Sequence, residues 1–133
     1  MPALISLLSL EPRYRLALRT VALALFAGIV ITGSIPGARA EAGKFASGVV
    51  LHGMTYSFLT LLWFLGSSGS VASRALKAVL AIALMGAADE LVQSFLPYRS
   101  GDVRDWLVDV TAATTTSFLL ALLAFRAVPA RQQ

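Results

Sequence analysis

The chain has 133 residues, of which 57% are hydrophobic and 14% are charged, whereas a typical soluble domain is about 45–50% apolar and about 25% charged. This composition excludes an ordinary water-soluble globule and a highly charged disordered tail, and the absence of cysteine excludes a disulfide or thiolate scaffold. The net charge of +4 does not indicate nucleic-acid binding, because the basic residues are scattered and do not alternate with aromatic residues.

Long apolar tracts predict helices that span a membrane. The tracts 20–38 and 45–73 carry no formal charge and exceed the roughly 18 residues that a spanning helix needs. Two further tracts, 78–88 and 110–125, become long enough if Lys77 reaches the membrane surface and acidic residues are accepted near the other face. We therefore predict an all-α integral membrane bundle of four transmembrane helices, over about 16–35, 48–65, 76–96 and 106–125.

Turn-forming residues separate the predicted helices at 34–37, 66–70 and 97–101. No repeat or linker divides the sequence, so we predict a single domain over 1–133. The first tract has a second interpretation, because basic residues precede it and Ala38-Arg39-Ala40 follows it, as in a secretory signal. A retained helix is favoured, since the tract is longer than the usual h-region of about 7–15 residues, but cleavage stays open.

The distribution of basic residues predicts the orientation of the bundle. If the first helix is retained, seven basic residues lie on one side of the membrane and four on the other. The larger group is Arg13, Arg15, Arg19, Arg74, Lys77, Arg126 and Arg131, and the smaller group is Arg39, Lys44, Arg99 and Arg104. The positive-inside rule then places both termini in the cytoplasm.

The few ionisable residues within the predicted helices gather at one membrane face. Each costs on the order of 2.5–3.5 kcal/mol at a helix centre, so its presence indicates a function or a specific partner. His52 lies near the start of the second helix, Asp89 and Glu90 near the end of the third, and Asp105 and Asp109 at the start of the fourth. In an antiparallel bundle these three helix ends meet, which predicts one polar layer roughly 5–9 Å inside the outer face.

Each of these helices presents two polar side chains on one face, three or four residues apart. The pairs are His52 and Tyr56, Glu90 and Gln93, and Asp105 and Asp109. The loop between the last two helices adds Arg99 and Arg104. One such pair alone is typical of residues at a membrane interface, but three pairs at similar depth predict a common site.

Together these residues resemble the VanZ-like membrane proteins, a family named for a component of glycopeptide-resistance clusters. The family pattern is His-x-x-x-Tyr, then Glu-x-x-Gln, then Pro-x-Arg, with an Asp six residues after the Arg and an Asn four residues later. The matching residues are His52, Tyr56, Glu90, Gln93, Pro97, Arg99 and Asp105, with Asp109 in place of the Asn. The resemblance covers about 51–116, although Gly48-Val49 stands where the family commonly has Asp-Lys. It implies a multi-pass protein of the bacterial cytoplasmic membrane.

The resemblance and the mixed charges favour a site for a lipid headgroup or a lipid-linked cell-envelope precursor. Arg99 would hold a phosphate, and His52 and Glu90 would exchange protons. The candidate catalytic residues are His52, Glu90 and Asp105, and the candidate substrate-binding residues are Tyr56, Gln93, Arg99 and Asp109. We expect no cofactor, no metal and no nucleic-acid partner. Protein partners and enzymatic activity stay open, because no nucleophile with an adjacent base can be recognised.

Other interpretations of the polar layer remain. The same residues would also serve as a non-catalytic latch between helices in a structural or partner-binding membrane protein. A proton or ion path is less favoured, because no ionisable residue lies at mid-depth to continue the route. A metal site made from His52, Glu90, Asp105 and Asp109 is compatible in ligand type, but one histidine and scattered carboxylates form a loose signature.

Overall fold

The computed structural model describes residue 6 and residues 8–127, and within this part of the chain the regular structure is helical, without strands. The helices are α2 (Pro12–Gly33), α3 (Ala38–Gly43), α4 (Gly48–Gly66), α5 (Val71–Ser94) and α6 (Val103–Ala127). The all-α prediction is confirmed for these residues. The predicted breaks at 34–37, 66–70 and 97–101 fall at or between helix ends.

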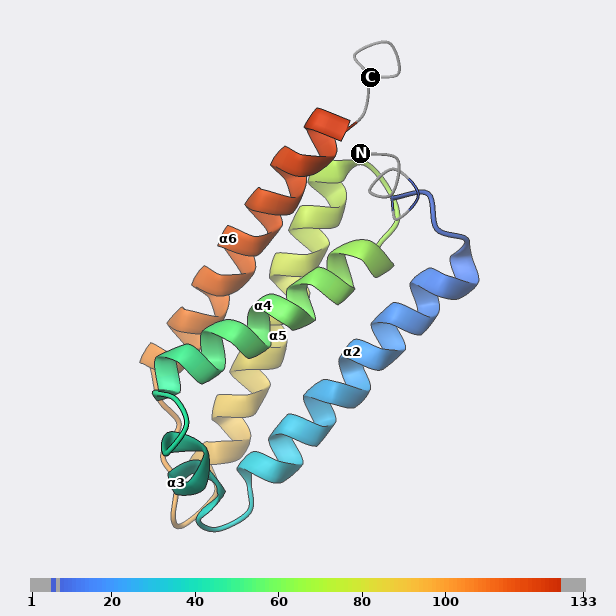
Figure 1. The fold of residues 1–133 in the computed structure, drawn as a ribbon. Coiled ribbons are helices and arrows are strands. Elements are labelled where there is room, and N and C mark those ends of the chain that lie inside the picture. Colours follow the sequence, from blue (N-terminus) through green and yellow to red (C-terminus); the bar gives the residue numbers. More distant parts are fainter. Residues whose placement is uncertain (1–5, 7, 128–133) are drawn as a thin grey trace.

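The four long helices form an up-and-down bundle in which successive long helices run in opposite directions (Figure 1). The helix α6 packs along both α5 and α4, whereas α2 packs mainly on α4. The short helix α3 lies at the end of the bundle where α4 begins, and α2 begins and α6 ends at the opposite end (Figure 1). The ends of α2 and α5 and the starts of α4 and α6 therefore meet beside α3.

Local sequence explains where the helices begin. The side chains of Ser47 and Ser70 accept hydrogen bonds from the backbone N–H groups of Val50 and Ser73, which caps the first turns of α4 and α5. Between α2 and α3 the chain turns through Gly37, whose φ of 85° is readily adopted by glycine. The helix α3 was not predicted from the sequence, because six residues are too few to show a periodic apolar pattern.

Three of the helices, α2, α4 and α6, are long and apolar enough to span a membrane. The helices α4 and α6 contain the whole of the predicted segments 48–65 and 106–125, and α2 contains all of the predicted segment 16–35 except its last two residues. The fourth predicted segment, 76–96, is helical within α5 up to Ser94, but α5 is not among the three. Its apolar stretch is shorter, because Arg74 and Lys77 lie near one end of α5 and Asp89 and Glu90 near the other.

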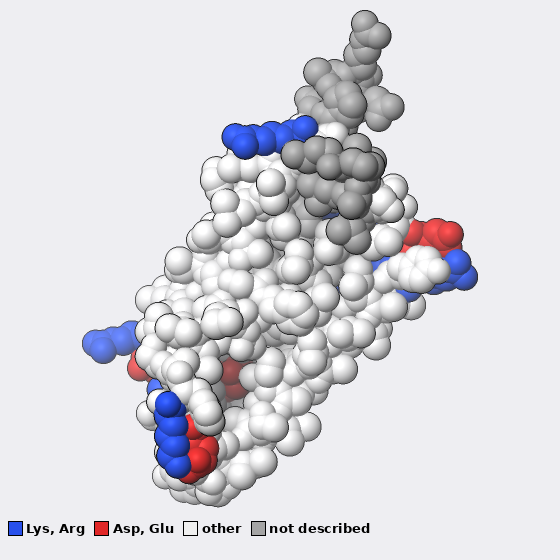
Figure 2. All heavy atoms as spheres, viewed as in Figure 1, with Lys and Arg blue, Asp and Glu red and all other residues white. Residues whose placement is uncertain are grey.

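The outer surface of the bundle suits lipid. Large apolar side chains such as Ile31, Met54, Phe58 and Phe118 are more than half exposed. Figure 2 shows charged side chains gathered toward the two ends of the visible face, with an almost uncharged band between them. Such a large apolar surface is not stable in water and is typical of a protein that contacts the hydrocarbon core of a membrane.

Small residues allow the helices to approach closely inside the bundle. Ala22, Ala78, Ala113 and Ala124 are fully buried, and such residues let backbones pack together in membrane bundles. Gly66, at the end of α4, lies directly against α2. A Cβ atom at this position would come within 2.8 Å of Arg19 Cγ and 2.9 Å of the Arg15 carbonyl oxygen.

We expect Gly66→Ala to destabilise the bundle by about 1–3 kcal/mol, because the added methyl group overpacks the contact between α4 and α2. Thermal unfolding of the purified protein in detergent measures the effect. Gly28→Ala is the matched control, since a Cβ atom at Gly28 meets nothing within 4 Å. Equal unfolding temperatures for the two variants would contradict the close approach of α2 and α4.

Candidate functional site

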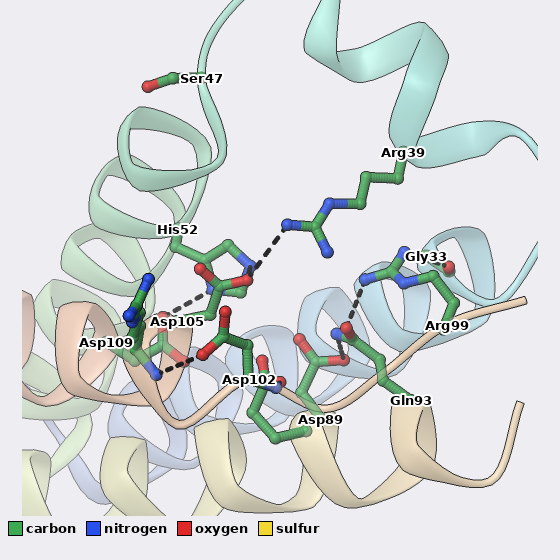
Figure 3. A network of polar contacts seen from close by, with 12 residues as sticks. Gly33, Arg39, Ser47, His52, Asp89, Gln93, Arg99, Asp102, Asp105 and Asp109 are labelled. Atoms are coloured by element: carbon green, nitrogen blue, oxygen red, sulfur yellow. Dashed lines mark hydrogen bonds and ion pairs between the residues drawn. The ribbon is translucent and has the colours of Figure 1, made fainter.

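The predicted site residues converge at the end of the bundle beside α3, where Figure 3 shows His52, Gln93, Arg99, Asp105 and Asp109. The helix α4 contributes His52 and Tyr56, the helix α5 contributes Glu90 and Gln93, and the helix α6 contributes Asp105 and Asp109; Arg99 comes from the loop between α5 and α6. The predicted grouping at one end of the antiparallel bundle is therefore what the structure shows, while the functional roles of these residues stay predictions.

His52 stands at the centre of the first group of contacts. Its Nδ1 lies 2.9 Å from Asp109 Oδ1 and its Nε2 lies 3.7 Å from Asp105 Oδ2. Arg39 of α3 approaches the same Asp105 oxygen to 3.5 Å (Figure 3). The Asp109 side chain is fully buried, whereas 53% of the Arg39 side chain is exposed. Two carboxylates of α6 therefore hold the imidazole from either side.

A second group of contacts forms a continuous chain of hydrogen bonds. The Tyr56 hydroxyl donates to Asp89 Oδ2 at 3.1 Å, and Gln93 Nε2 donates to Asp89 Oδ1 at 3.0 Å. Arg99 donates through Nη2 to Gln93 Oε1 and through Nη1 to the Gly33 carbonyl at 3.0 Å. Because the Gly33 carbonyl belongs to the last turn of α2, Arg99 ties the end of α2 to α5.

Glu90 links α5 to the start of α6. Its Oε2 accepts a hydrogen bond of 2.6 Å from the Asp102 backbone N–H, whereas its Oε1 is buried and has no hydrogen-bond partner. The loop passes close to this residue, because a Cβ atom at Gly101 would lie 2.5 Å from the Glu90 carbonyl oxygen. Glycine is therefore required for this close approach of the loop to the α5 backbone, and the next residue, Asp102, donates to the Glu90 carboxylate.

The same layer holds a set of metal-ligating atoms. One nitrogen of His52 and one carboxylate oxygen each of Glu90 and Asp109 lie within 4.8 Å of one another. Asp109 Oδ2 is buried and, like Glu90 Oε1, has no hydrogen-bond partner among the described residues. Within this part of the chain, His52, Glu90 and Asp109 form a group that could hold a cation.

A pocket of about 340 Å³ opens at this end of the bundle, lined by Ile35, Gly37, Arg39, Ala40, Tyr98 and Arg99. Its two charged lining residues are both arginines. A larger groove of about 1070 Å³ runs along α4 and α6 and is lined almost entirely by apolar side chains, including Phe58 and Leu119. The groove contains none of the predicted site residues.

The structure adds Arg39 to the layer and gives Asp89 contacts that were not predicted from the sequence. Arg39 was counted only as a determinant of orientation, although it contacts Asp105. Asp89 was placed in the layer but was not assigned a role, although it accepts hydrogen bonds from both Tyr56 and Gln93. The position of Arg39 at the predicted outer face was a usable signal for its presence in the layer, but no spacing rule links α3 to α6.

We expect Tyr56→Phe to destabilise the protein by about 1–3 kcal/mol, because it leaves a buried oxygen of Asp89 without its donor. Tyr56 is only 1% exposed, so water does not replace the hydroxyl. Thermal unfolding in detergent measures the loss. The control is Tyr98→Phe, which removes a hydroxyl from an exposed tyrosine that donates to the Ser34 carbonyl. If Tyr98→Phe lowered the unfolding temperature equally, the chain of hydrogen bonds from Tyr56 to Arg99 would not be the source of the stability that Tyr56→Phe removes.

Comparison with known proteins identifies the family. The family described as VanZ/LLP1 matches residues 8–124, a range that includes α4, α5 and nearly all of α6 and extends well beyond the motif residues. No curated protein and no solved structure matches the chain significantly. The match covers most of the chain, and the three apolar helices fit the membrane location of the family. The chain therefore belongs to the VanZ family and is a membrane protein of that family.

Proposed function

We propose that this protein binds the phosphate-bearing headgroup of a lipid or of a lipid-linked cell-envelope precursor at the outer face of a bacterial cytoplasmic membrane. The observation that supports the proposal is the pocket of about 340 Å³ whose two charged lining residues are Arg39 and Arg99. Guanidinium groups bind phosphate oxygens in a bidentate manner, and this volume is at the lower end of the range for small-ligand sites.

The contacts of the two arginines leave donors for a ligand. Arg39 is half exposed, and its only ion pair within the described residues is the long contact of 3.5 Å with Asp105. Arg99 uses Nη1 and Nη2 for the protein, but its Nε is buried without a partner. A phosphate in the pocket would therefore meet two positive charges at the depth where lipid headgroups lie.

His52 is the group that would exchange a proton with the bound headgroup. The fully buried Asp109 orients the imidazole through Nδ1, as a carboxylate does for a histidine that acts as an acid or a base. Asp105 lies between His52 and Arg39 and so connects the proton-exchanging group to the pocket. The hydrogen bonds of the His52 ring within the described residues include no hydroxyl nucleophile, so the proposed activity is binding, with any reaction following from it.

We propose that α5 is a fourth membrane span. The helix α5 has 24 residues and is therefore roughly 36 Å long, enough to cross the hydrocarbon core. Of its ionisable residues, Arg74, Asp89 and Glu90 are at least nine-tenths buried and face other helices. Lys77 is exposed and lies near the start of the helix, where its long side chain can reach the membrane surface. With four spans, the positive-inside rule places both termini in the cytoplasm and the polar layer on the outer side.

We expect Arg39→Ala and Arg99→Ala each to weaken binding of liposomes that contain a phosphomonoester lipid by about tenfold or more, because each change removes a charged donor from the pocket. Sedimentation with liposomes of phosphatidylcholine, with and without phosphatidic acid, measures the affinity of the full-length protein in nanodiscs or detergent.

Arg104→Ala is the control for this measurement, since Arg104 is an exposed arginine near the same end of the bundle that does not line the pocket. An equal loss of affinity in Arg104→Ala would mean that the protein attracts anionic lipid through general surface charge, and the proposal would fail. In cells, the same two pocket substitutions should change susceptibility to cell-envelope stress, including glycopeptide antibiotics, at unchanged protein level.

A latch between helices is the second candidate function. The continuous chain of hydrogen bonds from Tyr56 through Asp89 and Gln93 to Arg99 favours it. In a latch these residues only hold α2, α4 and α5 together, and a partner or a lipid surface provides the function. Arg99→Ala then lowers the amount of folded protein in the membrane. Folded Arg99→Ala protein with normal stability and lost lipid binding would contradict the latch.

The predicted orientation is testable because the chain contains no cysteine. Ser100→Cys places a thiol in the exposed loop beside the polar layer, and Ser68→Cys places one in the exposed loop at the opposite end of the bundle. A membrane-impermeant maleimide should label Ser100→Cys in intact spheroplasts and Ser68→Cys only after the membrane is permeabilised. The reverse pattern would place the polar layer in the cytoplasm.

A further inference from the structure

His52, Glu90 and Asp109 belong to three different helices, yet they bring their ligating atoms to one point. One nitrogen of His52 and one oxygen of each carboxylate lie within 4.8 Å of one another. The closest pair, His52 Nδ1 and Asp109 Oδ1, is separated by 2.9 Å (Figure 3). Ligand bonds of about 2.1 Å place neighbouring ligand atoms about 3.0 Å apart and opposite ones about 4.2 Å apart. A cation would therefore need the widest pair to close by up to roughly 0.6 Å if the two atoms are opposite ligands, and by up to roughly 1.8 Å if they are neighbouring ones.

The hydrogen bonds of the cluster are incomplete. Asp109 is fully buried, and its Oδ2 has no partner. Glu90 is about nine-tenths buried, and its Oε1 also has no partner. A buried carboxylate oxygen without a donor is strongly unfavourable, so two of them in one cluster indicate that a further positive group belongs there.

The charges of the layer also indicate that a positive group is missing from the cluster. Asp105 faces Arg39, whereas Glu90 and Asp109 have no arginine or lysine within ion-pair distance among the described residues. Among the described residues, His52 is the basic residue within ion-pair distance of Asp109, and one of its nitrogens lies within 4.8 Å of a Glu90 carboxylate oxygen. A divalent cation would balance both carboxylates with His52 neutral.

We infer that His52, Glu90 and Asp109 bind a divalent transition-metal cation. One imidazole with two carboxylates favours Zn²⁺ or Mn²⁺, because Ca²⁺ and Mg²⁺ prefer sites made of oxygen atoms alone. The cation takes the place of the proton that Nδ1 shares with Asp109 Oδ1. Nε2 then carries the ring proton and faces Asp105 Oδ2, which lies 3.7 Å away, beyond hydrogen-bond distance.

The glycine opposite the cluster is consistent with this role. Gly86 lies one turn before Glu90 on α5, and a Cβ atom there would come within 2.7 Å of Asp109 Oδ2. The Asp109 carboxylate therefore packs against the α5 backbone, which brings it toward the same helix that carries Glu90. The inference does not rest on the proposed headgroup site, because Arg39 and Arg99 are not ligands.

The test measures metal in the full-length protein, purified in detergent without a histidine tag, stripped with a chelator and dialysed against a small molar excess of Zn²⁺ or Mn²⁺. Mass spectrometry of the bound metal should find about one ion per chain. Glu90→Gln and Asp109→Asn should each lower the affinity by at least about tenfold, since loss of even an outer-shell partner costs about 10–100-fold. Glu41→Gln, which alters an exposed acidic residue of α3, should leave the affinity unchanged.

A second measurement needs no variant, because His52 is the only histidine of the chain. In protein labelled with ¹⁵N-histidine, addition of the metal should shift the Nδ1 resonance, and the unfolding temperature should rise. An unchanged Nδ1 resonance, or metal that Glu90→Gln and Asp109→Asn retain at full affinity, would overturn the inference. Metal binding that persists in Arg99→Ala, while lipid binding is lost, would separate this site from the proposed headgroup pocket.

Discussion

The structure depends on the need to pair acidic side chains inside a bundle whose outer surface is apolar. Asp89, Glu90, Asp105 and Asp109 are all at least nine-tenths buried. Water does not reach such groups freely, so each must find a donor or a cation on another element. Most of these partners come from a different helix or loop, which means that the carboxylates determine how α4, α5 and α6 are aligned along their axes.

Glycine and alanine make this alignment sterically feasible. Asp109 packs against Gly86, and the loop after α5 passes Glu90 at Gly101. At both places a Cβ atom would lie closer than atoms can approach. At the other end of the bundle, Gly66 allows α4 to approach the backbone of α2 closely. The polar contacts and the close backbone approaches therefore support one another, because neither pairing would form if the helices stood a side chain further apart.

The polar layer has two halves with different chemical character. In one half, Tyr56, Asp89, Gln93 and Arg99 satisfy one another and hold the end of α2, as expected of a structural contact. In the other half, Glu90 and Asp109 keep unpaired oxygens around His52. Hydrogen-bonding capacity that the protein itself does not use is what a ligand can use, so the oxygens of Glu90 and Asp109 suit a cation, whereas the unpaired Nε of Arg99 suits an anion.

The sequence by itself determined the helical class, the membrane environment and the gathering of polar residues at one end. These follow from composition, from the apolar tracts and from the antiparallel order of helices, all of which depend on local spacing. It also identified the VanZ-like motif residues. Only the tertiary structure decided that Asp109 pairs with His52, that Asp89 pairs with Tyr56, and that Arg39 of α3 joins the layer. Rotation and sliding of helices against each other set these contacts, and no spacing along one chain segment encodes them.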